Sequence, residues 1–110
     1  MSELTKKTSA AAQSAALLAA LWQRNLPRVR ERIQELHDAV MAASIGVLET
    51  VQRESAASTA HKLAGSLGMF GYHDGTDAAR RLELTLEAEG ELDIVALEDS
   101  FDALCRSLPL

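Results

Sequence analysis

The residues of this chain that could do chemistry centre on one histidine with unusually small neighbours. Gly65 and Gly68 follow His61 by four and seven residues, and Ser58 precedes it by about one helical turn. Near pH 7 an imidazole is partly neutral, and its free ring nitrogen can attack a phosphoryl group and carry it as a phosphohistidine. The spacing makes His61 a candidate functional residue, and carrying a phosphoryl group is one chemistry open to an exposed imidazole; the alternative is a surface histidine with no role.

The direction of this side chain follows from the apolar residues around it. At about 100° per residue, Ala60, Leu63 and Leu67 fall on one narrow stripe of a helix that spans roughly residues 55–70. His61 points about 140° away from the centre of that stripe and is predicted to project into water. Two glycines inside a helix cost roughly 1 kcal/mol each relative to Ala. We interpret them as room for an approaching partner; close packing against a neighbouring helix is the alternative.

Other reactive groups offer no second candidate site. His37 and His73 have no partner at a metal-ligand spacing, and Cys105 is the only cysteine, so we expect no metal site and no internal disulfide. We expect Cys105 to be a small buried hydrophobe. The chain lacks the glycine-rich loop that ends in Lys and Ser or Thr, so we expect no ATP binding by that route and no kinase activity of its own.

One locally basic cluster stands out in an acidic chain. We interpret it as a solvated face, with pairing to an acidic partner as the alternative. Its members are Arg24, Arg28, Arg30, Arg32 and Arg53.

Length and charge exclude several classes of function. The chain has 110 residues, enough for one domain, and a net charge of −5. An acidic surface repels phosphate backbones, which opposes nucleic-acid binding, including a helix-turn-helix module built around Ala60 and Gly65. No apolar run approaches the roughly 20 residues that span a bilayer. We therefore expect no membrane segment and a cytoplasmic location.

The chain favours helices throughout, because Ala and Leu are abundant and no alternating strand pattern occurs. Residues 1–8 are polar and are expected to be a disordered N-terminus, and residues 9–110 to be a single domain. The first helix is predicted over residues 9–25. The second begins at Pro27 and follows an apolar pattern that continues to Val51. Three further helices are predicted over residues 55–70, 77–89 and 93–108. We expect an all-α fold: an antiparallel four-helix bundle with an additional N-terminal helix packed on its side or end.

Punctuating residues set the predicted helix ends. Pro27 disfavours a helical conformation at Leu26 and suits the first turn of a new helix. Gly46 either ends the long helix or only weakens it. Gly90 suits the position just past a helix, and Asp93 is expected to begin the last one.

The segment that contains His61 resembles the motif of a known family. The segment Ala60–Gly71, AHKLAGSLGMFG, resembles the histidine phosphotransfer (HPt) domain motif A-H-x-L-K-G-S-x-x-x-x-G. The stretch AARRLE over residues 78–83 is similar to the family's next helix. At the level of helix order the likeness covers roughly residues 15–108, and only the twelve-residue motif is specific.

The resemblance implies a helical bundle with an exposed, phosphorylated His61. It also implies that Gly65 is the gap for the docking partner and that Ser66 and Gly71 are structural parts of the motif. The family usually has Lys three residues after the His, where this chain has Ala64. The neighbouring Lys62 could substitute in holding the phosphoryl charge.

We therefore expect a phosphoryl carrier of a two-component phosphorelay. A receiver aspartate or a sensor kinase, including a hybrid kinase, would donate to His61, and a response-regulator receiver would collect the group. The receiver would supply Mg²⁺, and the carrier would need no cofactor of its own. The alternative is a docking module that binds receivers without relaying phosphate. The residues expected to form the docking surface and phosphate environment are Ser58, Lys62, Gly65, Ser66, Gly68 and Met69.

Overall fold

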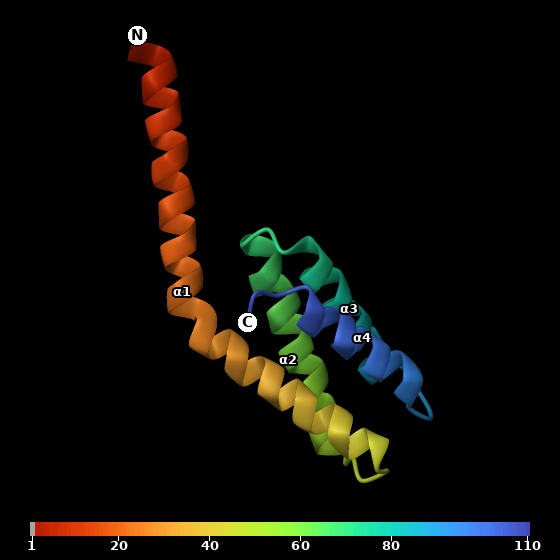
Figure 1. The fold of residues 1–110 in the computed structure, drawn as a ribbon. Coiled ribbons are helices and arrows are strands. Elements are labelled where there is room, and N and C mark those ends of the chain that lie inside the picture. The colour runs from red at the N-terminus through yellow and green to blue at the C-terminus, as the bar shows by residue number, and fades with distance from the viewer. Residues whose placement is uncertain (1) are drawn as a thin grey trace.

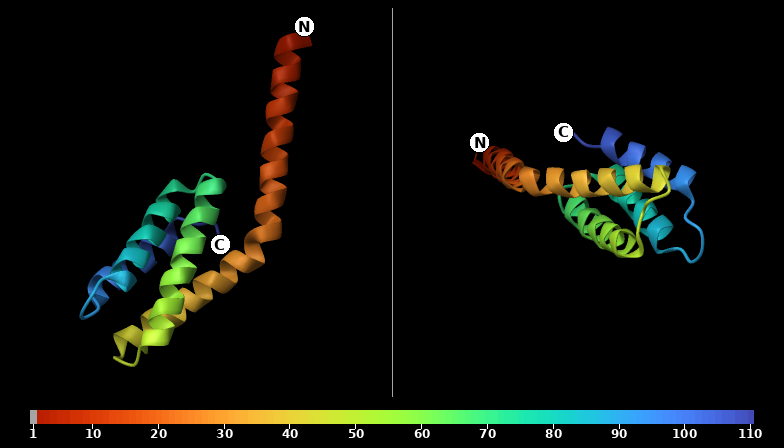
Figure 2. Two further views of the ribbon diagram at one scale, coloured as in Figure 1. Left: turned by 180° about the vertical axis from the view of Figure 1, so that it is seen from behind. Right: turned by 90° about the horizontal axis from the view of Figure 1, so that it is seen from below.

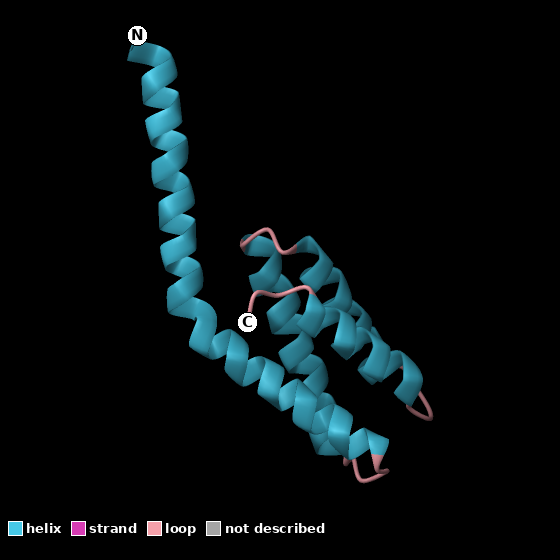
Figure 3. Cartoon of the chain, viewed as in Figure 1, coloured by secondary structure: helices cyan, strands magenta, loops and turns pink. Residues whose placement is uncertain are grey.

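Four helices joined by short loops make up the fold (Figure 1). The computed structural model describes residues 2–110, and the side chains from residue 10 onwards. Within residues 2–110 every regular element is a helix, and the remaining segments are loops and turns (Figure 3). The helices are α1 (Ser2–Ser44), α2 (Thr50–Met69), α3 (His73–Glu87) and α4 (Ile94–Arg106).

The four helices surround one core, and helices that follow one another in the chain are neighbours in space. α2 packs between α1 and α3, and α4 completes the ring by contacting α3 and α1. Each helix turns an apolar stripe inward, because burying a leucine side chain contributes about 1.5–3 kcal/mol. The largest fully buried side chains are Val29, Leu36, Leu63, Leu67, Leu82, Leu97 and Leu104. The predicted all-α four-helix bundle is confirmed.

The predicted break at Pro27 is wrong. α1 is continuous through this residue, and it bends sharply in the orange part of the ribbon (Figure 1). A proline ring inside a helix removes one hydrogen bond and clashes with the preceding turn, so a bend follows. The buried residues Trp22 and Val29, one on each side of Pro27, anchor α1 to the bundle close to the bend. The sequence predicted two helices here, and packing against the bundle keeps them as one bent helix.

The N-terminal part of α1 extends away from the bundle instead of packing on its side (Figure 2). Leu18 and Leu21 of this part are 42% and 43% exposed, whereas Trp22 is buried. Trp22 packs against Phe70 and Tyr72, with ring centroids 5.3 and 4.6 Å apart. We expected residues 1–8 to be disordered. Met1 lies outside the described residues, and α1 begins at Ser2.

Most glycine and cap signals act as predicted, while several helix ends shift. Gly46, with φ of 75°, lies just past the end of α1 at Ser44. The helix that begins the apolar pattern at Pro27 therefore does not continue to Val51, whose side chain is 76% exposed. Gly90, with φ of 85°, lies in the turn after α3 and not directly past it, because α3 ends at Glu87, two residues earlier than predicted. Asp93 caps α4, its Oδ1 accepting a hydrogen bond from the Ala96 backbone N–H at 3.0 Å. α2 and α3 begin about one turn earlier than expected, at Thr50 and His73.

Within the described part of the chain, none of the helices combines the length and the apolar character needed to cross a membrane.

Candidate functional site

His61 lies in the middle of α2 with its ring in water. Its neighbours Ala60 and Leu63 are fully buried in the core, whereas the His61 side chain is 74% exposed. Helical geometry explains the contrast, because consecutive residues lie about 100° apart around the axis. The predicted exposure of His61 is confirmed.

A carboxylate from the next helix holds one nitrogen of this ring. His61 Nδ1 lies 2.7 Å from Oε2 of Glu83, whose side chain is only 16% exposed on α3. In the neutral ring this contact requires Nδ1–H to donate to the carboxylate, which places the lone pair on Nε2. The pair therefore fixes both the orientation of the ring and the nitrogen that is free to attack.

A small hollow of about 230 Å³ lies beside the ring. Gly65 keeps it open, because no atom outside the glycine's own helical backbone lies within 4 Å of the place where its Cβ would be. The open space expected at Gly65 is therefore present, and its use by a docking partner stays a prediction. The lining residues come from α2 and α3: His61, Ala64, Gly65, Arg80, Glu83 and Leu84.

Gly68 belongs to the interior contact between α2 and α3. A Cβ added there would lie 3.4 Å from Thr76 Oγ1, and Thr76 itself donates a hydrogen bond to the Ala64 carbonyl at 3.1 Å. This placement favours the close-packing alternative for Gly68 over an opening for a partner. The two glycines of the motif therefore have different roles: Gly65 clears the surface and Gly68 lets two helices approach.

A second, larger groove of about 730 Å³ lies on the α1 side of the same helix. Gly65 lines both hollows, so the groove adjoins the histidine site. Ser66 lies in the groove wall, where its Oγ accepts a hydrogen bond from Asn25 Nδ2 at 3.0 Å. The groove combines four cationic side chains with an apolar part. Its lining residues are Leu21, Arg24, Asn25, Arg28, Arg32, Lys62, Gly65, Ser66, Met69 and Phe70.

The structure divides the predicted docking residues and the basic cluster. Lys62, Gly65, Ser66 and Met69 lie together in the groove, whereas Ser58 is exposed but lines neither hollow. Within the basic cluster, Arg24, Arg28 and Arg32 line the groove, and Arg30 is exposed outside it.

Arg53 has a structural role away from this surface. Its guanidinium donates to backbone carbonyls at the end of α3 and just beyond it: Leu86 at 2.8 Å, Ala88 at 2.6 Å and Gly90 at 3.2 Å. These carbonyls have no further helical turn to bond with, so Arg53 caps α3.

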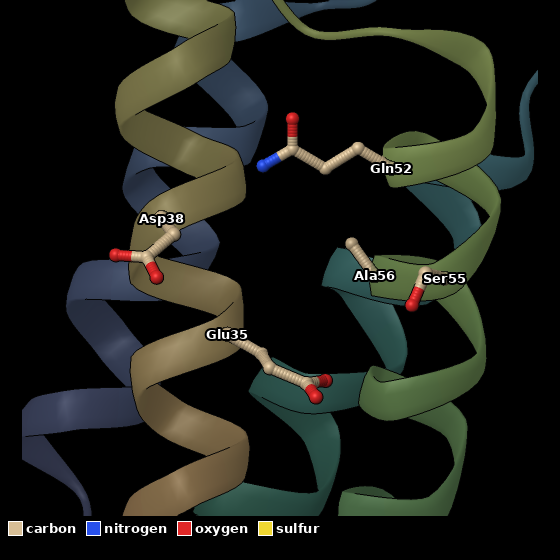
Figure 4. Close-up of a pocket in the computed structure, with 5 residues that line it drawn as sticks. All are labelled: Glu35, Asp38, Gln52, Ser55 and Ala56. Atoms are coloured by element: carbon tan, nitrogen blue, oxygen red, sulfur yellow. The ribbon is translucent and has the colours of Figure 1, made fainter.

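The remaining hollows and thiol are poorer candidates. A hollow of about 180 Å³ between α1 and α2 is lined by Glu35, Asp38, Gln52, Ser55 and Ala56 (Figure 4). Its lining contains no histidine and no cation that could hold a phosphoryl group, and Glu35 accepts a hydrogen bond from Thr59. Burial, helped by the charge of Asp102, raises the pKa of the half-buried Cys105 thiol, which keeps it protonated and unreactive. Among the described side chains, no cluster of three His, Cys, Asp or Glu residues is placed to hold a metal ion.

No local signal marks Glu83 or Arg80 as part of the site. Both lie in the stretch that resembles the family's next helix, but neither is near His61 in the sequence. Only the packing of α3 on α2 brings them into the hollow beside the ring.

The comparison with known families assigns the chain to one family. The Hpt domain family matches residues 9–108, which is nearly the whole chain; the match includes α2, α3 and α4 and all of α1 except its first residues. No curated protein and no solved structure matches the chain. The exposed histidine and the glycine gap lie within the matched range. The chain therefore belongs to the Hpt domain family, the phosphotransfer modules of two-component systems.

Proposed function

We propose that this protein is a phosphorelay intermediate that carries a phosphoryl group on His61. The group comes from a receiver aspartate or from a sensor kinase, and it leaves to a response-regulator receiver. The single observation that carries this proposal is the His61–Glu83 pair, a solvent-exposed imidazole held at Nδ1 by a largely buried carboxylate. A carrier needs its nucleophile at the surface, because the second active site belongs to the partner.

The geometry supports a direct displacement at Nε2. As Nε2 of neutral His61 attacks the phosphorus of an aspartyl phosphate, the N–P bond forms and the bond to the aspartate oxygen breaks. The electron pair of the broken bond leaves with the aspartate, which becomes a carboxylate. The proton stays on Nδ1, where the Glu83 carboxylate offsets the positive charge that develops on the ring. No general base is needed, and transfer to the next aspartate reverses these steps.

The receiver is proposed to dock across the groove between α1 and α2. A receiver active site carries carboxylates, and we expect it to bring the Mg²⁺ that neutralises the phosphoryl oxygens. The cations Arg28, Arg32 and Lys62 suit the negative rim of such a site, while Met69, 77% exposed, supplies apolar contact area. Gly65 lies between groove and histidine, so a partner seated here reaches His61.

The alternative is a module that docks receivers without relaying phosphate. Ala64 favours it, because the family motif has Lys at this position to hold the phosphoryl charge. The two proposals differ in one observable: the alternative predicts binding without a covalent product.

Label transfer tests the choice. The purified protein is incubated with a receiver carrying ³²P-phosphoaspartate, using a panel of receivers, and binding to each receiver is measured in parallel by calorimetry. We expect acid-labile, alkali-stable label on the wild type and none on His61→Gln. His37→Gln is the matched control, because this exposed histidine lines neither hollow and should label as the wild type does. Binding without label in the wild type would support the docking module instead.

A further inference from the structure

The histidine site lacks the cation that the family motif places closest to it. Ala64 is 4% exposed at the wall of the hollow beside His61 and has no charge. A phosphoryl group on Nε2 brings up to two negative charges and three acceptor oxygens, which a charged donor stabilises most strongly. Some other side chain must supply that donor, or the phosphoryl group relies on the partner alone.

The cation nearest to His61 in the sequence lies in a different hollow. Lys62 lines the groove that faces α1, and it is not part of the hollow that holds His61 and Glu83. Arg80 of α3, in contrast, lines that hollow together with Ala64. Arg80 precedes Glu83 and Leu84 by three and four residues, so all three lie on one face of α3.

The guanidinium of Arg80 is available for an anion. Arg80 is exposed, and among the described side chains it forms no ion pair with a carboxylate. Its planar fork of N–H donors matches the oxygens of a phosphoryl group, and it stays charged at all physiological pH values. Glu83 already holds Nδ1, so the exposed Nε2 edge of the ring is where the phosphoryl oxygens will be.

We propose that Arg80 binds the phosphoryl oxygens on phosphorylated His61, in place of the lysine that is missing at position 64. This inference rests on the proposed function of His61 and adds a second helix to the phosphate site. α3 then supplies both charges: Glu83 orients the imidazole, and Arg80 stabilises the group that the imidazole carries.

The test uses phosphoramidate, which phosphorylates exposed histidines without any partner protein. The ³¹P NMR signal that is lost in His61→Gln identifies the phosphoryl group on His61. Its second pKa is measured in the wild type, in Arg80→Ala and in Arg81→Ala. Arg81 is the matched control, because it is the adjacent exposed arginine and does not line the hollow. The double variant Arg80→Ala with Ala64→Lys returns a cation from α2.

We expect the pKa of the phosphoryl group to be higher in Arg80→Ala than in the wild type by about half a unit or more, because a nearby cation favours the dianion. Arg81→Ala should match the wild type, and Ala64→Lys should restore the lower value. Transfer from a receiver to His61 should slow about tenfold in Arg80→Ala, because the phosphorylated histidine that forms loses one charged hydrogen bond. Equal titration of the wild type and Arg80→Ala would overturn the inference. Absence of transfer from every receiver, with the titration difference intact, would refute only the relay.

Discussion

Glu83 on α3 determines which nitrogen of His61 on α2 is available to react, through a 2.7 Å contact with Nδ1. The carboxylate is largely buried while the ring is largely exposed, so the two residues divide the work of the site. The Glu83 carboxylate is held in the bundle, and the Nε2 edge of the His61 ring faces the solvent. This arrangement leads to the first prediction.

Replacing Glu83 by Gln should slow phosphorylation of His61 roughly tenfold, because a neutral amide cannot offset the charge that develops on the imidazole. ¹⁵N NMR of the ring should also change: the wild type should be mainly the Nδ1–H tautomer, and Glu83→Gln a mixture. Glu87→Gln, one turn later on α3 and exposed, is the control with the same chemical change. Unchanged tautomers and rates in Glu83→Gln would contradict the role of the pair.

Gly65→Ala should move stability and activity in opposite directions. Alanine at this helical position meets no atom within 4 Å, so the free energy of unfolding should rise by about 1 kcal/mol. The added methyl group narrows the approach to His61, so transfer from a receiver should slow, and more strongly in Gly65→Leu. Urea denaturation and label transfer measure the two effects.

Gly68→Ala is the control for Gly65→Ala, because it makes the same change at the other glycine of α2. Its new Cβ would lie 3.4 Å from Thr76 Oγ1, so the gain in stability should be smaller. Because it faces α3, transfer should stay within about twofold of the wild type. A loss of transfer as large as that of Gly65→Ala would argue against a specific opening at Gly65.

Reversing charge in the groove should weaken receiver association. Arg28→Glu and Arg32→Glu place negative charge where we propose that the receiver's acidic rim docks, so the association rate should fall several-fold at low salt. Raising the ionic strength should shrink the difference from the wild type. Arg30→Glu makes the same charge change on the same helix outside the groove and should have a smaller effect. Stopped-flow binding at several salt concentrations is the measurement, and equal effects of all three variants would refute a defined docking groove.

Arg53→Ala should destabilise the bundle without affecting chemistry. It removes three hydrogen bonds to carbonyls at and beyond the end of α3, which should lower the free energy of unfolding by about 1–3 kcal/mol. Well below the melting temperature, transfer should equal that of the wild type, because Arg53 lines neither hollow at the histidine. A normal melting temperature in this variant would show that the cap contributes nothing.

Local spacing was sufficient for the features that depend on one helix. The exposure of His61 follows from its place relative to Leu63 and Leu67 on α2, since a helix repeats at a fixed angle. The Asp93 cap could be predicted for a similar reason, because this signal acts within a few residues of itself.

Packing between helices decided the rest, since it depends on contacts between residues far apart in the chain. The sequence predicted two helices divided at Pro27; the anchoring of Trp22 and Val29 keeps one bent helix, and no local rule contains that contact. The sequence by itself therefore determined that His61, the proposed nucleophile, faces the solvent. Only the tertiary structure, by laying α3 against α2, decided that Glu83 and Arg80 surround it.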